Sequence, residues 1–478
     1  MSIRFGTDGW RAVIAEDFTF ANVRLAAQAT ANYVNAELRG EAQPSVVVGF
    51  DTRFLSDRFA MAVATVLAAN DLHVFLTRAD APTPAVSYNV LAQGAAAGIM
   101  ITASHNPPRY NGFKLKSRQG CAMSKAETER VEHHLAALLK SGETARDMDY
   151  DQALAEGRIE RFEPAWTYFE HLNQLLDMDK VSLSEARVVA DAMFGSGRNT
   201  FPSILSRTRC TVTEIRGYMN PGFEAIHPEP IEKYLKMLMA TIKAQHADIG
   251  IATDGDADRI GAMDGEGRFV DPHTIMALAL RYLVEERGLC GSVVKTVSTT
   301  AMLNRIAKKH GLELHETPVG FSYIADLMLA GGVLIGGEES GGISISGHIP
   351  EGDGILMGLL LLEIMGAHQA PLAELVDDLQ KNFGPTVYQR VDLHLKQPVP
   401  KSEMVQRLAE NAPAQMAGQA VRDVLTADGA KFILADESWL LVRPSGTEPV
   451  LRVYAEGTSE AEVAAILAVG QELAALAN

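Results

Sequence analysis

A serine in a polar turn is the first group in this chain whose type and setting could support chemistry. Ser104 lies in the segment Thr102-Ala-Ser-His-Asn-Pro-Pro108, directly after the apolar run Ala97–Ile101. A serine at the end of a strand, held by residues that favour turns, suits a nucleophile or a phosphate carrier. The pattern is also typical of an ordinary Asn-Pro turn, and no G-x-S-x-G elbow supports an α/β-hydrolase serine.

A second candidate site is the acidic segment Asp254-Gly-Asp256-Ala-Asp258-Arg259. Carboxylates at i, i+2 and i+4 point the same way on an extended backbone, so we expect three oxygens to converge on one hard cation. An EF-hand is excluded, because its sixth position would be Arg259 and its twelfth Gly265. Three carboxylates undersaturate Ca²⁺, which makes Mg²⁺ completed by a phosphate oxygen the better fit, with a solvated acidic turn as the alternative.

A glycine-rich turn, Gly336-Gly-Glu-Glu-Ser-Gly-Gly342, places polar side chains on a backbone that can approach a ligand closely. The Glu338 carboxylate accepts hydrogen bonds and the Ser340 hydroxyl donates or accepts them, as sugar hydroxyls require. His348, a few residues further on, could act as an acid or a base near neutral pH. A lone histidine is more often a structural hydrogen-bonding group.

The fourth candidate site follows an expected strand near the C-terminus. It combines guanidinium groups, two hydroxyls and a glycine that frees backbone N–H groups, which is typical of a phosphate nest. The residues expected to form it are Arg443, Ser445, Gly446, Thr447 and Arg452. Arg11 and Lys114 are further basic candidates, each of which could equally be a surface charge.

The chain repeatedly shows a short apolar, β-branched run that ends in a Gly- or Asp-rich turn. This pattern predicts the strands that must position the candidate residues. Such runs are 45–51, 186–191, 247–253 and 332–337. Stretches with helical periodicity lie between them, at 19–38, 58–69, 125–139, 165–176, 231–245 and 354–365. The alternation predicts parallel α/β units, in which functional groups gather where strands end and loops begin.

Breaks in this pattern divide the chain into four segments. The polar stretch 141–158 and the Gly-Pro break 381–385 lack a periodic apolar face and are interpreted as linkers. An expected hairpin around Asp264-Gly265 marks a further division, after which a new α/β series begins. We therefore expect three similar α/β domains, at 1–150, 158–262 and 263–380, and a smaller C-terminal α+β domain at 386–478.

Composition excludes several classes of protein. The 478 residues carry 43 basic and 60 acidic side chains, a net charge of −17 that would repel a nucleic acid. The three cysteines are isolated, which argues against disulfides and fits a reducing cytoplasm. No secretory signal is apparent at the start, and the longest apolar run, 355–367, is too short to span a membrane. Because the whole chain is negatively charged, a small anionic substrate could bind only where a few Arg, Lys or metal charges make the site locally positive.

Taken together and in this order, the four motifs resemble those of the α-D-phosphohexomutase family, which includes phosphoglucomutase, phosphomannomutase and phosphoglucosamine mutase. The similarity runs from the segment Phe5-Gly-Thr-Asp-Gly9 to Arg452. It implies three α/β domains and a smaller C-terminal domain around a central cleft. It also implies an enzyme, an intramolecular phosphotransferase that uses Mg²⁺ and is activated by a hexose 1,6-bisphosphate.

The resemblance implies a role for each candidate residue. Ser104 would carry a phosphoryl group. The Mg²⁺ ligands would be Ser104, Asp254, Asp256 and Asp258. Glu338 and Ser340 would hold the sugar hydroxyls. The substrate phosphate would be bound by Arg443, Ser445, Gly446, Thr447 and Arg452. Arg11, Lys114 and Arg259 would line the cleft. The family often has Lys where this chain has Ser322 and His where it has Gly342, which leaves His348 and Lys114 as candidates for the general acid/base.

The implied reaction interconverts a hexose 1-phosphate and a hexose 6-phosphate through phospho-Ser104 and a bisphosphate. Glu-Glu-Ser at 338–340 favours glucose, with mannose as a further substrate. A phosphoglucosamine mutase and a non-catalytic phosphosugar-binding protein are the alternatives. The expected partners are hexose phosphates, with no nucleic acid and no membrane, for a cytoplasmic monomer or homo-oligomer. The C-terminal domain is expected to move about the linker 381–385, because the bisphosphate must turn over between two transfers.

Overall fold

The computed structural model describes residues 3–477 except 7, 38–43, 395–400 and 445–449. It consists of mixed α/β sheets followed by a C-terminal antiparallel sheet, which confirms the expected fold class. The chain divides into two compact units. The first unit comprises residues 1–275, 320–332 and 340–373, and the second comprises residues 276–319, 333–339 and 374–478.

The first sheet of the first unit has six strands in the order β1-β5-β4-β2-β3-β6. They are β1 (Trp10–Val13), β2 (Ser45–Phe50), β3 (His73–Thr77), β4 (Ala97–Ile101), β5 (Tyr110–Lys116) and β6 (Ile159–Phe162). Strands β2, β3, β4 and β6 run parallel, while β5 pairs antiparallel with β4 and β1. Strand β6 lies beyond the expected end of this domain at residue 150, because the stretch expected to be a linker contains α5 (Tyr150–Ala155) and leads into the sheet.

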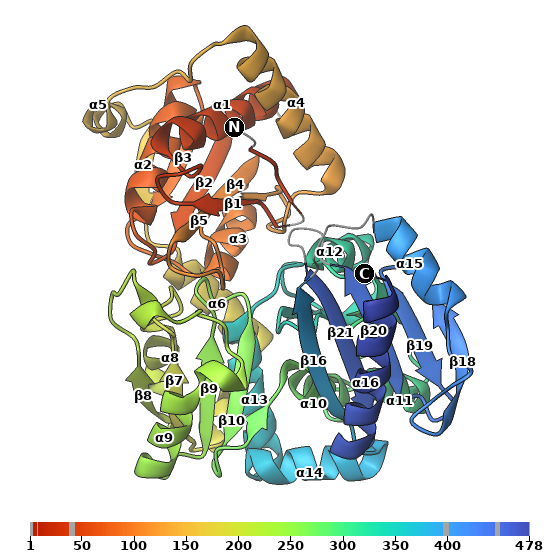
Figure 1. The fold of residues 1–478 in the computed structure, drawn as a ribbon. Coiled ribbons are helices and arrows are strands. Elements are labelled where there is room, and N and C mark those ends of the chain that lie inside the picture. The colour runs from red at the N-terminus through yellow and green to blue at the C-terminus, as the bar shows by residue number, and fades with distance from the viewer. Residues whose placement is uncertain (1–2, 7, 38–43, 395–400, 445–449, 478) are drawn as a thin grey trace. The chain divides into compact units, whose positions relative to one another are not determined.

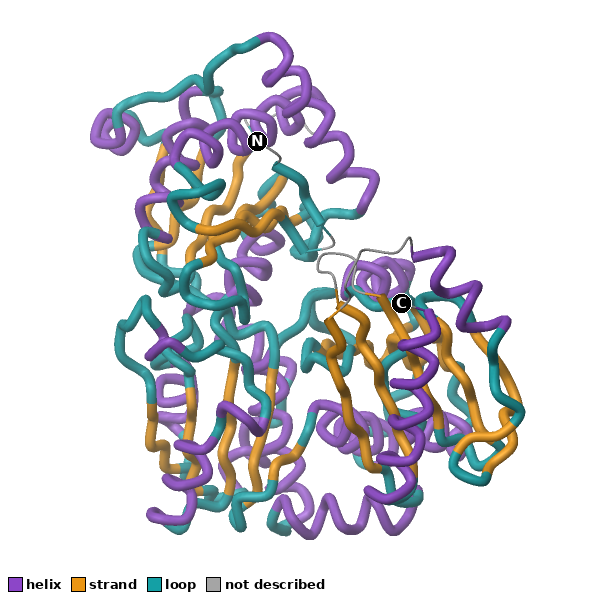
Figure 2. Tube along the Cα trace, viewed as in Figure 1, coloured by secondary structure: helices purple, strands orange, loops and turns teal. Residues whose placement is uncertain are grey.

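Helices cover both faces of this sheet (Figure 2). They are α1 (Phe20–Glu37), α2 (Ser56–Ala69), α3 (Thr83–Ala92) and α4 (Lys125–Ser141). Successive side chains of β2 point to opposite faces: Val46 and Val48 belong to the core under α1 and α2, while Val47 belongs to the core formed with Val86 and Val90 of α3. The apolar run of β2 is therefore buried on both sides, as a parallel strand requires.

The second sheet of the first unit has the order β11-β10-β9-β7-β8. Its strands are β7 (Arg187–Asp191), β8 (Thr211–Ile215), β9 (Ile249–Thr253), β10 (Ile260–Asp264) and β11 (Phe269–Val270). Strands β10 and β11 form the expected hairpin. The helices of this region are α6 (Ala165–Leu175), α7 (Met178–Leu183), α8 (Thr200–Ile204) and α9 (Lys236–Gln245). Helix α9 begins five residues later than expected, after a short 3₁₀ turn at Glu232–Tyr234.

Helix α13 (Gly354–His368) packs on the second sheet although it follows the third domain's strands in the sequence (Figure 1). It contacts α7, β9 and β10, and thirteen of its residues are buried. Twelve of these are apolar, as a helix enclosed on all sides requires, and the other is Glu363. A Cβ atom on Gly366 would lie 1.8 Å from the carbonyl oxygen of Lys180, so only glycine permits this approach of α13 to α7. The first unit also contains α12 (Phe321–Ala330) and β15 (Ile343–Ile345).

The second unit contains a parallel set of strands and the C-terminal sheet. The parallel strands are β12 (Ser292–Thr296), β13 (Leu314–Thr317) and β14 (Val333–Gly337), with α11 (Met302–His310). The C-terminal strands are β16 (Val387–His394), β17 (Gln415–Met416), β18 (Gln419–Leu425), β19 (Ala430–Leu434), β20 (Trp439–Pro444) and β21 (Val450–Gly457), in the order β16-β21-β20-β19-β18-β17. Helices α15 (Lys401–Glu410) and α16 (Glu460–Ala477) complete this domain, and α16 packs on β20 and β21.

The parallel strands and the C-terminal sheet share a core inside the second unit. Val297 and Ala301 pack with Trp439, Leu441 and Tyr454. The Glu456 carboxylate, 1% exposed, accepts hydrogen bonds from the backbone N–H of Ala301 at 2.7 Å and from Trp439 Nε1 at 3.1 Å. The C-terminal domain is thus fixed to its neighbour by buried contacts as well as by the chain connection.

Two helices contain points in the sequence at which the chain passes from one unit to the other. Helix α10 (Pro272–Glu285) spans the junction at residue 275, and α14 (Leu372–Phe383) spans the junction at 373. Helix α14 occupies most of the expected linker 381–385, and β16 begins four residues after it ends. Among the described residues no single helix is long and apolar enough to cross a membrane, and only α13 and α14 together pass that test, as a bent pair.

Candidate active site

The Ser104 turn connects β4 to β5 in the first unit. Ser104 is 1% exposed and has a φ of 51°, in the left-handed region that costs a non-glycine residue about 1 to 2 kcal/mol. Its backbone N–H donates to Thr102 Oγ1 at 2.9 Å, and its hydroxyl donates to Asp254 Oδ2 at 2.9 Å. Strained backbone of this kind is typical of functional sites, where the surrounding structure holds it in place.

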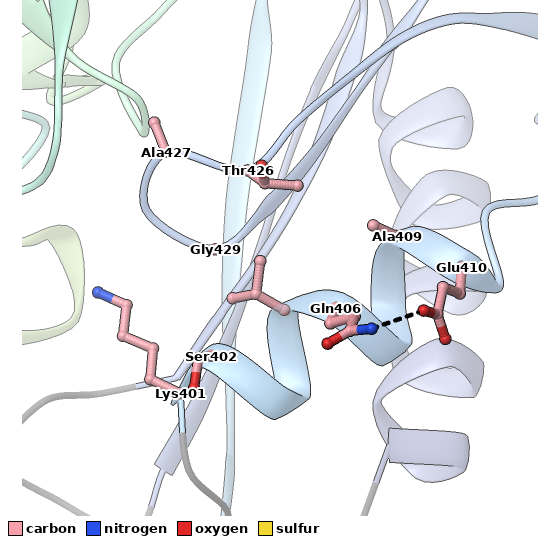
Figure 3. A pocket seen from close by; sticks show the side chains of 9 residues that line it. Lys401, Ser402, Gln406, Ala409, Glu410, Thr426, Ala427 and Gly429 are labelled. Atoms are coloured by element: carbon pink, nitrogen blue, oxygen red, sulfur yellow. Dashed lines mark hydrogen bonds between the residues drawn. The ribbon is translucent and has the colours of Figure 1, made fainter.

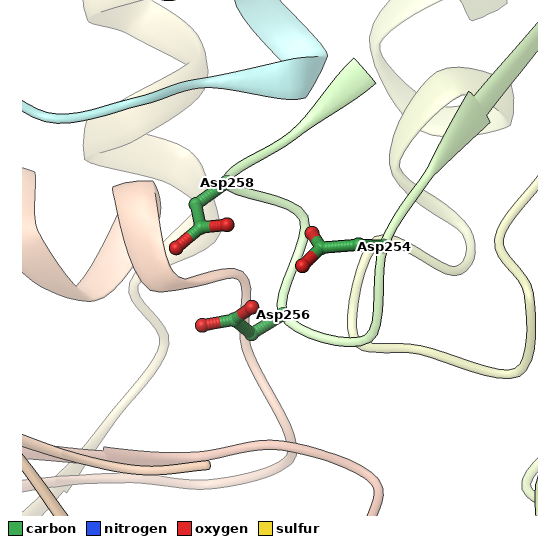
Figure 4. Close-up of side chains that lie close together, drawn as sticks. All are labelled: Asp254, Asp256 and Asp258. Atoms are coloured by element: carbon green, nitrogen blue, oxygen red, sulfur yellow. The ribbon is translucent and has the colours of Figure 1, made fainter. Parts of the chain in front are cut away.

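The acidic residues Asp254, Asp256 and Asp258 lie on the turn that follows β9 (Figure 4). All three are buried, and each offers a carboxylate oxygen within 4.8 Å of the others. The expectation that the oxygens converge is confirmed, but the reason given for it was wrong. The backbone is not extended here: β9 ends at Thr253, and Ala257 has a φ of 61°, so a tight turn brings the carboxylates together.

Lys114, on β5, is the cation that faces this acidic turn. Its Nζ lies 2.8 Å from Asp258 Oδ2, 2.9 Å from Asp256 Oδ2 and 3.0 Å from Asp8 Oδ2. Burial alone would lower the pKa of Lys114, but the three carboxylates more than offset burial and hold that pKa well above its usual value. The side chain is therefore a fixed positive charge in the site.

The carboxylates that face Lys114 differ in pKa. Burial would raise the pKa of Asp256, but Lys114 and a hydrogen bond from Thr83 lower it below the ordinary range. Burial and then the neighbouring carboxylates Asp258 and Asp256 raise the pKa of Asp254 well above its usual value. One lysine thus does not neutralise three buried carboxylates.

The acidic turn fits a divalent cation on an observation independent of charge. The Oδ1 atoms of Asp256 and Asp258 are buried and accept no hydrogen bond from any described residue. Buried carboxylate oxygens normally have partners, and hard cations such as Mg²⁺ and Ca²⁺ take oxygen ligands of this kind. Asp254, Asp256 and Asp258 are the residues that would hold the ion.

Of the other basic residues predicted for this region, Arg11 contacts the Ser104 turn and Arg259 the acidic turn. Arg11 donates to Asn106 Oδ1 at 2.7 Å and to Asp8 Oδ2 at 2.5 Å. The Arg259 backbone N–H donates to Asp254 Oδ1 at 3.3 Å, and its Nε lies 3.9 Å from Asp258 Oδ1. Three cationic side chains therefore gather in a protein of strongly negative net charge, but each lies beside carboxylates, so an anionic substrate would also need the positive charge of a bound cation.

The glycine-rich turn expected to hold sugar hydroxyls follows β14. Its C-terminal part packs against the start of β10, directly after the acidic turn: a Cβ atom on Gly341 would lie 2.6 Å from the carbonyl oxygen of Ile260. Glu338 and Ser340 are both half-buried, the former in the second unit and the latter in the first. The carboxylate of Glu339, between them, lies 3.5 Å from Arg390 NH1 of β16 within the second unit.

Three arginines share one face of the C-terminal sheet. Arg443 of β20 is directly opposite Arg452 of β21, which is opposite Asp392 of β16, and Arg390 lies two residues before Asp392. Directly paired residues, and residues two apart on one strand, point to the same face. Arg443 Nε donates to Asp428 Oδ2 at 2.8 Å. Ser445, Gly446 and Thr447 lie outside the described residues.

His348 lies in a buried cluster of the first unit. Its side chain is 0% exposed, with Nδ1 2.9 Å from His171 Nε2 of α6 and Nε2 3.0 Å from Asp353 Oδ2. Asp353 also accepts from Tyr168 OH and caps α13 through the N–H groups of Ile355 and Leu356. These contacts account for His348 as a structural group, and its acid/base role stays a prediction.

Four residues of this region were not predicted from the sequence as parts of the site: Asp8, Arg53, Thr83 and His105. Asp8 lies inside the N-terminal motif that was noted, so its carboxylate could have been included. Thr83 Oγ1 donates to Asp256 Oδ2 at 2.6 Å from the start of α3, which no local pattern indicates. His105 Nδ1 lies 3.3 Å from Ser104 Oγ, and burial followed by the nearby arginines and Lys114 lowers its pKa well below the usual value.

A cavity of about 920 Å³ lies in the second unit, beside α15 and the turn between β18 and β19 (Figure 3). Lys401, Thr426 and Gly429 are among its lining residues. Lys401 Nζ and Arg443 both bind the carboxylate of Asp428, so one edge of the cavity adjoins the arginine face. Of the predicted site residues that the structure describes, none lines it.

Four family models for phosphoglucomutase/phosphomannomutase together match most of the chain, in the order of the family's domains. Alpha/beta/alpha domain I matches residues 2–141, domain II residues 167–267, domain III residues 271–383 and the C-terminal domain residues 397–469. The chain is 32% identical to the phosphoglucomutase/phosphomannomutase of Thermococcus kodakarensis, over 98% of each protein. It is also 32% identical to the phosphoglucosamine mutase of Caldicellulosiruptor bescii, over 96% of each.

A solved structure agrees with these matches. The crystal structure of the "putative phosphomannomutase" of Thermus thermophilus is 34% identical in sequence, covers 99% of both chains and superposes with a TM-score of 0.87. The chain therefore belongs to the phosphoglucomutase/phosphomannomutase family of the phosphohexomutase superfamily, and it is an intramolecular phosphotransferase.

Proposed function

We propose that this enzyme interconverts hexose 1-phosphates and hexose 6-phosphates through phosphorylated Ser104 and a hexose 1,6-bisphosphate, with glucose as the preferred hexose. The observation that carries the proposal is the 2.9 Å hydrogen bond from Ser104 Oγ to Asp254 Oδ2, across 150 residues of sequence. A buried serine hydroxyl beside an acidic turn and a fixed lysine has the surroundings that phosphoryl transfer requires, namely positioning and charge neutralisation.

In the proposed reaction the phosphoryl group passes from Ser104 Oγ to a sugar hydroxyl. The new P–O bond forms at the sugar oxygen and the P–Oγ bond breaks, while the proton lost by the sugar hydroxyl is returned to Oγ, so that Ser104 leaves as a neutral hydroxyl. The resulting bisphosphate reorients and returns its other phosphoryl group to Ser104. Lys114 and Arg11 stabilise the charge on the transferred group. Mg²⁺ held by Asp254, Asp256 and Asp258 would neutralise the phosphoryl oxygens.

The substrate's second phosphate is assigned to the C-terminal domain. Arg443 and Arg452 lie on one face of the sheet, and the segment 445–449 that contains Ser445, Gly446 and Thr447 follows Arg443 directly. Guanidinium groups bind phosphate oxygens bidentately, and one such site could hold either end of the bisphosphate. Asp428 fixes Arg443 through Nε, and within the described part of the chain no hydrogen bond holds the two terminal nitrogens of that guanidinium, which could bind a ligand.

The choice of sugar is assigned to the turn 338–340. Glu338 and Ser340 would bind sugar hydroxyls, while Arg390 holds the intervening Glu339 carboxylate. Glucosamine phosphates are the second candidate substrate class, because several relatives at 31–33% identity over most of this chain are named phosphoglucosamine mutases.

The test compares wild type with Ser104→Ala on glucose 1-phosphate, mannose 1-phosphate and glucosamine 1-phosphate, each primed with its bisphosphate. Ser104→Ala should lose at least about 10³-fold in kcat, because the covalent carrier disappears while binding persists. Intact-protein mass spectrometry should show an added phosphoryl group on wild type alone. The highest kcat/KM should belong to glucose 1-phosphate.

Two results would contradict the proposal in different ways. Full activity in Ser104→Ala would remove the phosphoserine mechanism. A kcat/KM for glucosamine 1-phosphate above that for both other sugars would keep the mechanism and reassign the substrate.

A further inference from the structure

The guanidinium of Arg53 lies at the centre of the Ser104 turn. Its side chain is 0% exposed and comes from the turn after β2. NH2 donates to the carbonyl oxygens of Ser104 at 2.5 Å and Asn106 at 2.6 Å, and NH1 donates to those of Pro107 at 2.9 Å and Tyr110 at 3.0 Å. One side chain from outside the turn thus binds four of its carbonyl groups.

A second connection joins Arg53 to the backbone N–H of Ser104. Arg53 Nε lies 3.1 Å from Asp51 Oδ2, which accepts from Thr102 Oγ1 at 2.6 Å. Thr102 Oγ1 in turn accepts from the Ser104 N–H at 2.9 Å. Both polar groups of the Ser104 backbone, the N–H and the C=O, are therefore fixed by one network that begins at the Asp51–Arg53 pair.

The turn needs such a network because its own N–H groups satisfy only some of its carbonyl groups. Pro107 and Pro108 have no N–H to donate, and Ser104 is held in a left-handed conformation. The Pro107 carbonyl also accepts from the Tyr110 N–H at 3.0 Å, but no backbone N–H of the described residues donates to the carbonyls of Ser104 and Asn106. Buried carbonyl groups without partners are costly, so without Arg53 these two would turn toward water and the strained residue would relax. Relaxation at Ser104 would move its Oγ away from Asp254.

The same residue also fixes the turn to the neighbouring domain of the first unit. The Arg53 guanidinium lies over the ring of Phe223, 5.1 Å from its centroid, and Phe223 is fully buried. Thr52 Oγ1 donates to the carbonyl oxygen of Phe194 at 2.7 Å, in the loop after β7. These contacts join the turn after β2 to the domain that carries the acidic turn.

We propose that Arg53 is a positioning residue for phosphoryl transfer: it holds the Ser104 backbone in the conformation in which Oγ faces Asp254 and the acidic turn. This inference rests on the proposed role of Ser104 as the phosphate carrier. Lysine cannot replace Arg53, because a single ammonium group with three donors does not reach carbonyl groups spread over residues 104–110.

The chain contains a matched control in a second buried Asp–Arg pair. Arg216 Nε donates to Asp191 Oδ1 at 2.8 Å, and both side chains are almost fully buried. Asp191 Oδ1 accepts from the backbone N–H two residues later, as Asp51 Oδ1 does. Arg216 binds the carbonyl oxygen of Tyr234 rather than carbonyl groups of the Ser104 turn. Arg216→Lys therefore measures how far the loss of a buried Asp–Arg pair alone lowers stability and kcat, without disturbing the Ser104 turn.

The experiment compares Arg53→Lys, Arg216→Lys and Thr102→Val in the full-length enzyme. Arg53→Lys should lower kcat for glucose 1-phosphate by about 10²-fold, because a displacement of about 1 Å can cost that much, while KM stays unchanged. Thr102→Val, which removes one hydroxyl of the network at nearly constant volume, should lower kcat less. Arg216→Lys should keep the wild-type kcat even if its melting temperature falls as far as that of Arg53→Lys.

Hydrogen exchange measured by mass spectrometry gives a readout that does not depend on catalysis. The amides of Ser104, Asn106 and Tyr110 are hydrogen-bonded in the turn, so the peptide 101–113 should exchange faster in Arg53→Lys and Thr102→Val but not in Arg216→Lys.

Three results would overturn the inference: unchanged exchange in Arg53→Lys, an unchanged kcat in Arg53→Lys, or an equal loss of kcat in Arg216→Lys. If Arg53→Lys does not fold, Thr102→Val alone decides by the same two readouts. Activity in Ser104→Ala would instead refute the proposed function, and the exchange result would still decide whether Arg53 positions the turn.

Discussion

At the scale of single residues, the balance of charge beside Ser104 determines what the site can bind. Asp254, Asp256 and Asp258 face Lys114 and, at 3.9 Å from Asp258, Arg259, and two of their oxygens have no hydrogen-bond partner among the described residues. A phosphorylated Ser104 would add more negative charge at the same place. Like charges this close are not stable together in a buried site without a cation.

Removal of divalent ions should therefore stop the enzyme. Excess chelator should abolish isomerisation, and Mg²⁺ should restore it. Asp256→Asn should weaken Mg²⁺ binding, measured by calorimetry, at least about tenfold, because it removes one ligand charge. Asp264→Asn is the control: Asp264 is equally buried but binds Arg268 at the β10–β11 hairpin, so Mg²⁺ affinity should not change. Undiminished turnover in chelator would reassign the acidic turn to a structural role.

At the scale of elements, α6 and α13 are joined by the cluster around His348. Helix α13 supports β9 and β10, between which the acidic turn lies, and Asp353 caps its N-terminus. Tyr168 OH of α6 donates to Asp353 Oδ2 at 2.7 Å, and His171 of α6 lies between the ring of Tyr88 and His348. This packing links the position of the acidic turn to two helices that are distant in sequence.

The His171 ring predicts a pH dependence of stability. Burial and then His348 lower the pKa of His171 to about 4, while Asp353 acts in the opposite direction. Below about pH 6.5 the unfolded chain binds a proton that the folded chain does not, so this group's contribution to the free energy of unfolding falls as the pH falls to about 4. His171→Gln should flatten the dependence of melting temperature on pH in this window. Equal slopes for wild type and variant would contradict the assignment.

At the scale of the whole molecule, contacts within the second unit limit how the C-terminal domain can move. Glu456 binds Ala301 and Trp439, Lys431 binds Glu316 at 2.8 Å, and the N–H of Val319 donates to Asp428. A rotation about 381–385 alone would break these interactions. Each buried polar group left without its partner would cost about 1 to 3 kcal/mol. The parallel strands and the C-terminal sheet should therefore remain together when substrate binds.

Distances between spin labels can test this expectation. Labels at Lys308→Cys of α11 and Glu472→Cys of α16, both exposed, should report the same distance with and without hexose phosphate, after the exposed Cys290 is replaced by serine. Glu456→Ala should broaden the distribution, because it removes the acceptor shared by Ala301 and Trp439. A shift of the distance on substrate binding would instead place the hinge at 381–385.

The sequence by itself determined the residue types of the site and the order of its turns. Ser104 after an apolar strand, the three aspartates at spacing two and the glycine-rich turn at 336–342 are local patterns, because each depends on a few consecutive residues at the end of a strand. The α/β class follows from the same alternation and is confirmed by the sheets. The helices expected at 58–69, 125–139 and 165–176 match α2, α4 and α6 to within two residues.

Only the tertiary structure decided which of these groups meet. The contacts of Ser104 with Asp254 and of Lys114 with Asp256 and Asp258 join residues more than 140 positions apart, and Arg53 reaches the Ser104 turn from another strand. Helix α13 packs on a sheet that belongs to an earlier part of the chain. Local spacing contains no information on such pairs, because they depend on which buried surfaces fit together and on which buried polar groups must find partners.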